Sequence, residues 1–215
     1  MMRCALVLAC SMLLCASIAR ASDTAKSPDG LYSVSVVPVG KGDENGSGAQ
    51  ALVLSRADGE VLRRLLTSRW NDDYSRNLAS LSNPMFSLDG GYVYFNTTDA
   101  SPNSGYVHQV DLKMNVIKAV CPGWGLRVMR TGPYRGYLLV QTHRYYEPPR
   151  AGSFNPVYLT HPSGKKIMLV PGSDNDDGEL AIDPWLAKLN HYRPRPVGSR
   201  RVAEASLFGA VWLSR

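Results

Sequence analysis

Beyond the first 21 residues, the histidines and cysteines that could serve as bases, nucleophiles or metal ligands are His108, His143, His161, His191 and Cys121. The histidines are scattered beside expected strands and turns, without the close spacing that metal ligands on one element show. Cys121 ends an apolar run and has no histidine nearby in a recognisable pattern, so we expect it to pack as a small apolar side chain. These residues predict neither a metal site nor a nucleophile, and no cofactor is indicated.

Carboxylates are concentrated in two places. Residues 174–179, DNDDGE, resemble a calcium loop, but with Gly178 at its sixth position the twelfth is Pro184, where a bidentate Glu is required. An acidic surface turn is the favoured interpretation. Asp72 and Asp73 could serve glycosidase chemistry only opposite another carboxylate, which the sequence does not place. The sequence also lacks G-x-S-x-G, H-E-x-x-H, C-x-x-C, Walker-type and G-x-G-x-x-G motifs, so we expect no catalysis.

A set of aromatic and charged residues gives the strongest functional signal. Aromatics and arginines are enriched in the hot spots of protein interfaces, and here they gather in residues 67–82 and 144–155. The candidate partner-binding residues, with Arg69 beside them, are Trp70, Asp72, Asp73, Tyr74, Arg76, Arg144, Tyr145, Tyr146, Arg150 and Phe154. The alternative is that the aromatics fold back over the sheet edges, and the sequence leaves both open.

Three similar stretches of chain must position these residues. Each has a turn ending on a glycine (Gly30, Gly90 or Gly136), then a strand, a loop, a second strand, a short turn and a third strand. Runs such as YVYF favour strands, and D-G or S-G pairs favour hairpin turns. A further short strand before Gly90 and before Gly136 gives four strands in meander order, which is the pattern of one propeller blade.

The predicted fold is therefore all-β: a small β-propeller-like meander with three clear repeats, three or four blades, and a short C-terminal helix. Asp183 is expected to cap that helix and Pro184 to occupy its first position. The first repeat leaves little room for its own first strand. We expect that strand to come from the C-terminal part, for example residues 179–182 or 207–213, and to close the ring.

The ends of the chain differ from its middle. Residues 1–21 have the basic start, apolar run and A-x-A ending of a secretory signal peptide, although Cys10 after V-L-A leaves a lipoprotein signal as the alternative. We expect a signal peptide at 1–21, a propeller-like domain at 22–191 and a basic tail at 192–215. The predicted location is the periplasm or the medium, without a transmembrane span.

The net charge of +6 resides in these ends. Of the 24 basic and 18 acidic residues, seven arginines and Glu204 lie in the two end segments, which leaves 17 of each sign in the domain. A neutral domain has no broad positive surface for a polyanion. Nucleic acid is therefore not an expected partner, and a periplasmic protein is.

The stretch NPMFSLDGGYVYFNT, followed by SGYVHQVDLKMNVIKAV, resembles the TolB-like (WD40-like) propeller repeat, in which S-P-D-G links two strands and a V-D-L strand follows. Residues 27–30 match that turn, 87–90 match with Leu for Pro, and 133–136 keep only the glycine. The resemblance covers residues 27–171 and implies an envelope propeller, although TolB-like propellers are larger. In size, export and pattern the chain also resembles small periplasmic immunity proteins that neutralise injected cell-wall hydrolases.

Meander order predicts where the long connections emerge. Loops between second and third strands (38–50, 97–105 and 145–155) and the linker 67–82 to the next blade share one side, whereas the other side has short turns. Long loops in compact domains are often functional. The predicted function is an exported, non-enzymatic protein-binding module that neutralises a periplasmic enzyme or toxin. The alternatives are a TolB-like envelope scaffold and a propeller enzyme acting on glycans or peptides.

Overall fold

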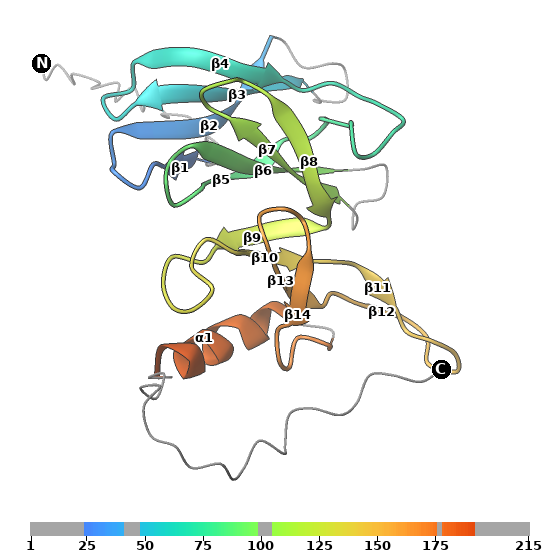
Figure 1. The fold of residues 1–215 in the computed structure, drawn as a ribbon. Coiled ribbons are helices and arrows are strands. Elements are labelled where there is room, and N and C mark those ends of the chain that lie inside the picture. Colours follow the sequence, from blue (N-terminus) through green and yellow to red (C-terminus); the bar gives the residue numbers. More distant parts are fainter. Residues whose placement is uncertain (1–23, 41–47, 99–104, 176–177, 192–215) are drawn as a thin grey trace, which may run out of the picture.

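The computed structural model of the protein describes residues 24–40, 48–98, 105–175 and 178–191 (Figure 1). These residues form three four-stranded antiparallel sheets and their connections, and each sheet has its strands in chain order except for an insertion in the third. The first sheet holds β1 (Thr24–Lys26), β2 (Tyr32–Val39), β3 (Ala49–Arg56) and β4 (Val61–Thr67). The second holds β5 (Ser82–Phe86), β6 (Tyr92–Thr98), β7 (Gly105–Asp111) and β8 (Ile117–Pro122).

The third sheet holds β9 (Trp124–Val128), β10 (Leu138–Gln141), β13 (Val157–Thr160) and β14 (Lys166–Leu169). Its second and third strands are joined through a separate two-stranded ribbon, β11 (Arg144–Tyr145) and β12 (Ser153–Phe154). A 3-10 turn, η1 (Gly178–Ala181), leads into the helix α1 (Ile182–His191). The predicted all-β, propeller-like meander with three repeats and a short C-terminal helix is confirmed.

The three sheets and the helix are stacked in layers, from the first sheet at the top of Figure 1 to α1 at the bottom. Three hydrophobic clusters fill the spaces between the layers. Val36 and Leu52 pack with Phe95 between the first and second sheets, and Tyr94 packs with Val140 between the second and third. The third cluster lies between the third sheet and the helix. Side chains that alternate in direction along a strand thus serve two neighbouring layers.

Two sequence expectations about the ends of the domain need correction. The first sheet has its own first strand, because β1 pairs with β2 in the register Ala25↔Val34. Three residues are enough for this strand, so no C-terminal segment needs to supply it. Residues 179–182 are not a strand: they belong to η1 and the start of α1, while 207–213 lies outside the described residues. The helix is present and begins at Ile182, which places Asp183 inside its first turn rather than before it.

The two D-G turns that the repeat pattern singles out have the same hydrogen bonds. In the second, the Ser87 hydroxyl donates to Asp89 Oδ1 at 2.5 Å, and the backbone N–H groups of Tyr92 and Gly91 donate to Ser87 Oγ and Asp89 Oδ1. The equivalent bonds of the first turn run among residues 27–32. The Ser87 hydroxyl and the Gly91 amide lower the pKa of Asp89. Gly90 has φ of 71°, a conformation that favours glycine.

Buried amides join the second sheet to the third. Asn96 on β6 is buried, and its side chain pairs with Gly125 of β9: Gly125 N–H donates to Asn96 Oδ1 at 2.8 Å, and Asn96 Nδ2 donates to Gly125 O at 2.9 Å. Asn83 Nδ2 donates to the same carbonyl at 2.7 Å. Because unpaired buried polar groups are costly, these bonds favour one relative placement of the two sheets.

Candidate functional site

The long connections of the meander lie along one side of the stack. In Figure 1 the linker between β4 and β5, residues 68–81, and the β11–β12 ribbon are on the right, whereas the turns β1–β2, β3–β4 and β9–β10 are on the left. The remaining two long loops include residues 41–47 and 99–104, which lie outside the described part of the chain. The linker and the ribbon carry all ten candidate residues.

The linker is held against the body at both of its ends. Arg69 and Leu78 exchange backbone hydrogen bonds, with N···O distances of 3.4 and 3.0 Å. The Leu78 and Leu81 side chains are buried in the core between the first and second sheets. Asn77 is buried as well, and its Nδ2 donates to the Thr98 carbonyl at 3.3 Å. The intervening residues 70–76 therefore project from a fixed base.

The tip of the linker is arranged by short-range polar contacts. Trp70 Nε1 donates to Asp72 Oδ1 at 3.0 Å, although the Trp70 side chain is 57% exposed. Asp73 accepts from the Ser75 hydroxyl at 2.7 Å, which lowers the pKa of Asp73, and it forms an exposed ion pair with Arg76 at 3.3 Å. Tyr74 is 49% exposed between them. The tip thus presents two aromatic rings, with Asp72 bonded to Trp70 and Asp73 paired with Arg76.

A buried histidine pins the linker to the second sheet. His108 on β7 is 1% exposed, and its Nε2 lies 3.0 Å from the Ser75 carbonyl oxygen. A carbonyl only accepts, so Nε2 carries the proton, and Nδ1 is free to accept from the Thr97 hydroxyl at 3.3 Å. Burial lowers the pKa of His108, which favours this neutral form. His108 is therefore a positioning residue for the linker rather than an available base.

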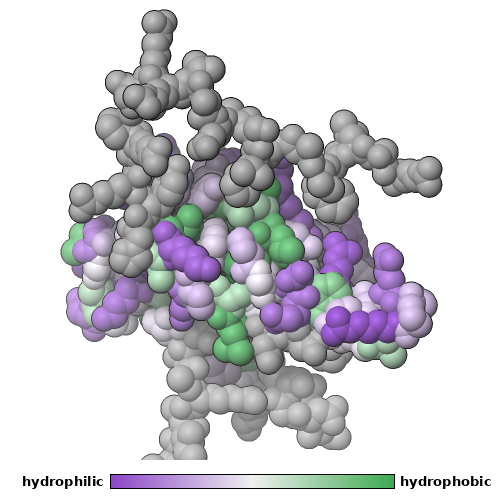
Figure 2. All heavy atoms as spheres, turned by 90° about the horizontal axis from the view of Figure 1, so that it is seen from below, coloured by the Kyte–Doolittle hydropathy of each residue, from purple (hydrophilic) through white to green (hydrophobic). Residues whose placement is uncertain are grey.

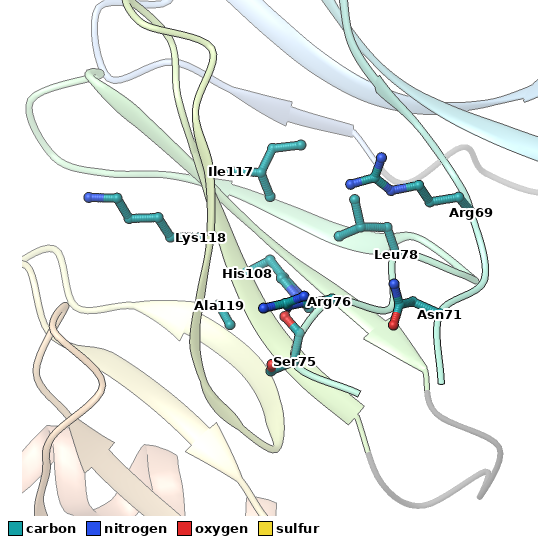
Figure 3. Close-up of a pocket in the computed structure, with 9 residues that line it drawn as sticks. All are labelled: Arg69, Asn71, Ser75, Arg76, Leu78, His108, Ile117, Lys118 and Ala119. Carbon is teal, nitrogen blue, oxygen red and sulfur yellow. The ribbon is translucent and has the colours of Figure 1, made fainter. Parts of the chain in front are cut away.

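Between the linker and β8 lies a pocket of about 720 Å³ (Figure 3). Figure 3 shows Arg69, Asn71, Ser75, Arg76 and Leu78 coming from the linker, and Ile117, Lys118 and Ala119 from β8, with His108 between them. The lining includes no Asp or Glu; Arg69 and Arg76 come from the linker, whereas the Lys118 side chain points to the other side of β8, away from them (Figure 3). Its chemistry suits an anionic group with an aliphatic portion.

The β11–β12 ribbon carries the other half of the candidate residues. The rings of Tyr146 and Phe154 stack with centroids 4.6 Å apart, and the Arg150 guanidinium lies 3.4 Å from the Tyr146 centroid. Tyr145 meets His143 edge to face at 4.9 Å and remains 76% exposed. Such stacks hold arginines and aromatics in fixed positions. The ribbon therefore presents Tyr145 from a supported base.

A cation of the third sheet lies near the ribbon. Lys166 on β14 lies with its Nζ 4.2 Å from the Tyr158 ring centroid. Burial lowers the pKa of Lys166, and the nearby charge of Arg144 lowers it further. The β13–β14 turn meets β8, because a Cβ atom built on Gly164 would lie 2.0 Å from the Val120 carbonyl oxygen. The second and third sheets therefore meet at this turn.

The contacts divide the ten candidate residues into a linker cluster and a ribbon cluster. Trp70, Tyr74 and Tyr145 project into solvent. Tyr146 and Phe154 instead stack on each other within the ribbon. The sequence did not indicate the pocket, or that His108, Ile117 and Lys118 line it. No local signal could have done so, because the linker and β8 are far apart in the chain and meet only where the linker docks on the second sheet.

The described residues show one thiol, which is buried, and no group of metal ligands. Cys121 is buried in the core between the second and third sheets, as predicted, and burial raises the pKa of its thiol to about 11. A thiol with that pKa is a poor nucleophile near neutral pH. Within the described residues, no three His, Cys, Asp or Glu side chains are grouped to hold a metal ion. No helix in the same part of the chain is long and apolar enough to cross a membrane.

Comparison with known proteins gives distant likenesses only. No protein-family model and no curated protein matches this chain. The solved structure of an acylaminoacyl peptidase from Pyrococcus horikoshii is similar over 65% of this chain and 23% of its own, with 14% identity and a TM-score of 0.42. The hydrazine synthase of Kuenenia stuttgartiensis is similar over 64% of this chain and 38% of its own, with 13% identity and a TM-score of 0.38. This chain thus spans well under half the length of either protein, and neither likeness bears on its activity or partners.

Proposed function

We propose that this protein is an exported, non-catalytic binding module that uses its long-loop side to neutralise a protein of the periplasm, in the manner of an immunity-type inhibitor. The observation that carries the proposal is the exposure of Trp70, Tyr74 and Tyr145 on two segments, the linker held by buried contacts and the ribbon held by ring stacking. Exposed large aromatics on a fixed base lose little conformational freedom on binding, and they are enriched among interface hot spots. Export rests on the signal-peptide pattern of residues 1–21.

A second candidate function is an envelope scaffold of the TolB-like kind, which would use the opposite, short-turn side. The observation that favours it is a set of exposed apolar side chains on that side: Leu31, Val61 and Met114 are 60%, 65% and 64% exposed. Two hydrogen bonds bring their segments together, from Ala57 N–H to the Leu31 carbonyl and from the Arg63 guanidinium to the Leu112 carbonyl. Apolar groups gathered on a surface mark interaction sites.

One capture experiment separates the two candidates. The tagged protein is incubated with the periplasmic and membrane extract of its own source, and the retained proteins are identified by mass spectrometry and quantified. For a hot spot, W70A or Y145A should weaken capture of a soluble partner by at least about 10-fold, while M114A leaves it intact. Loss on M114A alone, with envelope proteins retained by the wild type, would instead support the scaffold.

The control variant is L180A, which removes an exposed side chain from η1, outside the linker, the ribbon and the short turns. Figure 2 views the molecule from the side of α1, where hydrophobic residues lie among hydrophilic ones.

Capture of a partner that resists all three test variants would contradict both proposals. Hydrolysis of a glycan or peptide by the purified protein would support the enzyme alternative.

A further inference from the structure

His108 joins the linker to the second sheet through a side chain that is almost fully buried. It is 1% exposed, its Nε2–H donates to the Ser75 carbonyl at 3.0 Å, and its ring stacks on Phe95 with centroids 5.6 Å apart. Among the residues that line the pocket, His108 alone has a side chain whose ordinary pKa lies near 6.5. A change of pH in this range therefore acts on the linker through a single ring.

The charged groups around His108 oppose a positive charge on its ring. The ring lies between the linker, which brings Arg69 and Arg76, and β8, whose Lys118 points to the other side of the strand (Figure 3). Asp73 is the carboxylate paired with Arg76, at 3.3 Å, and it lies outside the pocket lining. The linker therefore covers the imidazole with cations and with no lining carboxylate that could compensate a second charge.

The strands beneath the ring add only neutral groups. The rings of Phe95 and Tyr106 lie 5.6 and 6.0 Å from the His108 ring, and the Thr97 hydroxyl lies 3.3 Å from Nδ1. Burial lowers the pKa of His108, and the backbone bonds to Ser75 and Tyr106 offset only part of this effect. A proton on Nδ1 would keep the bond to Ser75 and would meet a hydroxyl that can accept. Its cost therefore lies in burying the charge rather than in losing a hydrogen bond.

Of the elements around His108, the tip of the linker is the one that can open. β6 and β7 pair along seven residues of each strand, so they hold the ring from below. Among the described residues, the bond from His108 to Ser75 is the hydrogen bond that ties residues 70–76 to a strand. The other bonds of this tip lie within the linker itself. Opening the tip is thus the least costly way to let water reach the ring.

We propose that neutral His108 keeps the linker tip, residues 70–76, closed on the second sheet and that protonation of His108 releases it, so that binding through Trp70 and Tyr74 is sensitive to acid. The inference rests on the proposed function, because these two rings are offered to the partner. A released tip must be ordered again on binding, which weakens the affinity. Since the open form binds a proton that the closed form does not, the closed tip is favoured above about pH 6.5 and opening increases below it.

Hydrogen exchange of the full chain, resolved by NMR and corrected for the intrinsic effect of pH on exchange, measures this opening. The reporters are the backbone amides of Arg76, Asn77 and Leu78, which donate to carbonyls of the linker. We expect their opening constant to rise between about 5-fold and about 30-fold from about pH 7.5 to about pH 5. The upper value is the limit for a group with an ordinary pKa near 6.5 that stays neutral in the closed form.

Three variants assign the effect to one ring. H108Q keeps an N–H donor for Ser75 but does not titrate, so its linker amides should change less than about 2-fold over this range. T97V removes the hydroxyl at Nδ1 and keeps the titrating ring, so it should retain the pH response even where it loosens the linker. H161Q changes an exposed histidine of the β13–β14 turn and is the matched control, with a response equal to that of the wild type.

An amide of the third sheet distinguishes opening of the tip from loss of the fold. The Met129 amide donates to the Tyr137 carbonyl at 2.8 Å, away from the linker, and its protection should not follow the linker amides. An equal rise at Met129 would mean that the whole fold loosens, and the inference would be wrong. Equal pH responses in the wild type and H108Q, or no response in the wild type, would overturn it as well.

Partner capture at the two pH values separates failure of this inference from failure of the proposed function. The wild type should capture its soluble partner at least about 5-fold less well at about pH 5 than at about pH 7.5, whereas H108Q should lose much less. If capture by both falls equally, the partner does not depend on the release of the tip and the inference fails, while the binding function stands. If no partner is captured at about pH 7.5 although the linker amides respond through His108, the proposed function fails and the release of the tip stands.

Discussion

His108 gives the clearest case of a single residue that links the sheet to the candidate site. Its Nε2–H donates to Ser75 in the linker, and its burial lowers its pKa from the ordinary value near 6.5. The unfolded chain therefore binds a proton at mildly acidic pH that the folded protein does not bind. The contribution of neutral His108 to the free energy of unfolding should be fully present above about pH 6.5. It should decrease as the pH falls toward the lower pKa that His108 has in the folded protein.

The substitution His108→Gln tests this account, because glutamine retains an N–H donor but does not titrate. We expect the free energy of unfolding of the wild type, measured in urea, to decrease between about pH 7.5 and about pH 5, and that of H108Q to decrease much less. The matched control is H161Q, which changes an exposed histidine of the β13–β14 turn and should retain the wild-type decrease. If H108Q and the wild type lose equal stability, the neutral His108 is not what holds the linker.

At the residue scale, the sequence could predict what depends on near neighbours. Asp29 and Asp89 bond groups within three residues of themselves, so an S-x-D-G pattern is enough to predict both turns, even with Leu88 in place of Pro28. Cys121 could be assigned to the core because it ends an apolar run. The bond from His108 to Ser75 spans 33 residues and crosses from a sheet to a linker, and no local pattern contains it.

At the scale of elements, the β13–β14 turn determines how the second and third sheets meet. Gly164 has φ of 89°, and a Cβ atom there would lie 2.0 Å from the Val120 carbonyl oxygen. β8 carries a register irregularity at this point, because Val107 pairs with Cys121 whereas His108 pairs with Ala119. The extra residue is Val120, and its displaced carbonyl is the atom against which the turn packs.

Gly164→Ala should therefore destabilise the protein by more than the strain of placing a side chain at positive φ. A side chain at positive φ costs about 1–2 kcal/mol, and the added clash must move one of the two elements. We expect a loss of more than about 2 kcal/mol in the free energy of unfolding, measured in urea. Gly59→Ala is the control, since Gly59 has φ of 95° with nothing within 4 Å, and it should cost only the backbone term. Equal losses in the two variants would mean that the turn and β8 can separate freely.

The sequence predicted elements well where their pattern is long, and less well where contacts with other elements define them. Strands of seven or eight residues, such as β2 and β6, show clear β-forming composition. β1 has three residues, too few for a period, and it forms because β2 offers it an edge. The pocket depends on the docking of the linker on the second sheet, through contacts such as that of His108 with Ser75 over 33 residues, so its lining could not be predicted.

The whole molecule is a stack of three sheets that ends in a helix. The face of the third sheet that points away from the second carries Leu139 and Leu159, and α1 covers it with Ile182 and Trp185. A further blade of a propeller would pack on this face. In the described part of the chain the helix takes that place, so the stack of sheets ends at α1. The linker and the ribbon lie at the side of this stack (Figure 1).

If α1 completes the core of the third sheet, removing its largest side chain should destabilise the molecule strongly. Trp185 is buried and stacks on Tyr134, with ring centroids 6.4 Å apart, so Trp185→Ala should cost about 3–5 kcal/mol in the free energy of unfolding. Leu180→Ala, in η1 next to the helix, removes a side chain that is 74% exposed and should change stability by less than about 0.5 kcal/mol.

Partner capture by W185A, assayed below its unfolding midpoint, gives the second readout. The linker cluster packs on the second sheet through His108, and the third sheet lies between the second sheet and α1 (Figure 1), so capture that depends on Trp70 should persist in the folded fraction. A stable W185A protein would show that the third sheet does not need the helix, and that the stack can end on an uncovered face. Loss of Trp70-dependent capture in folded W185A would show instead that the helix and the linker respond to each other across the three layers.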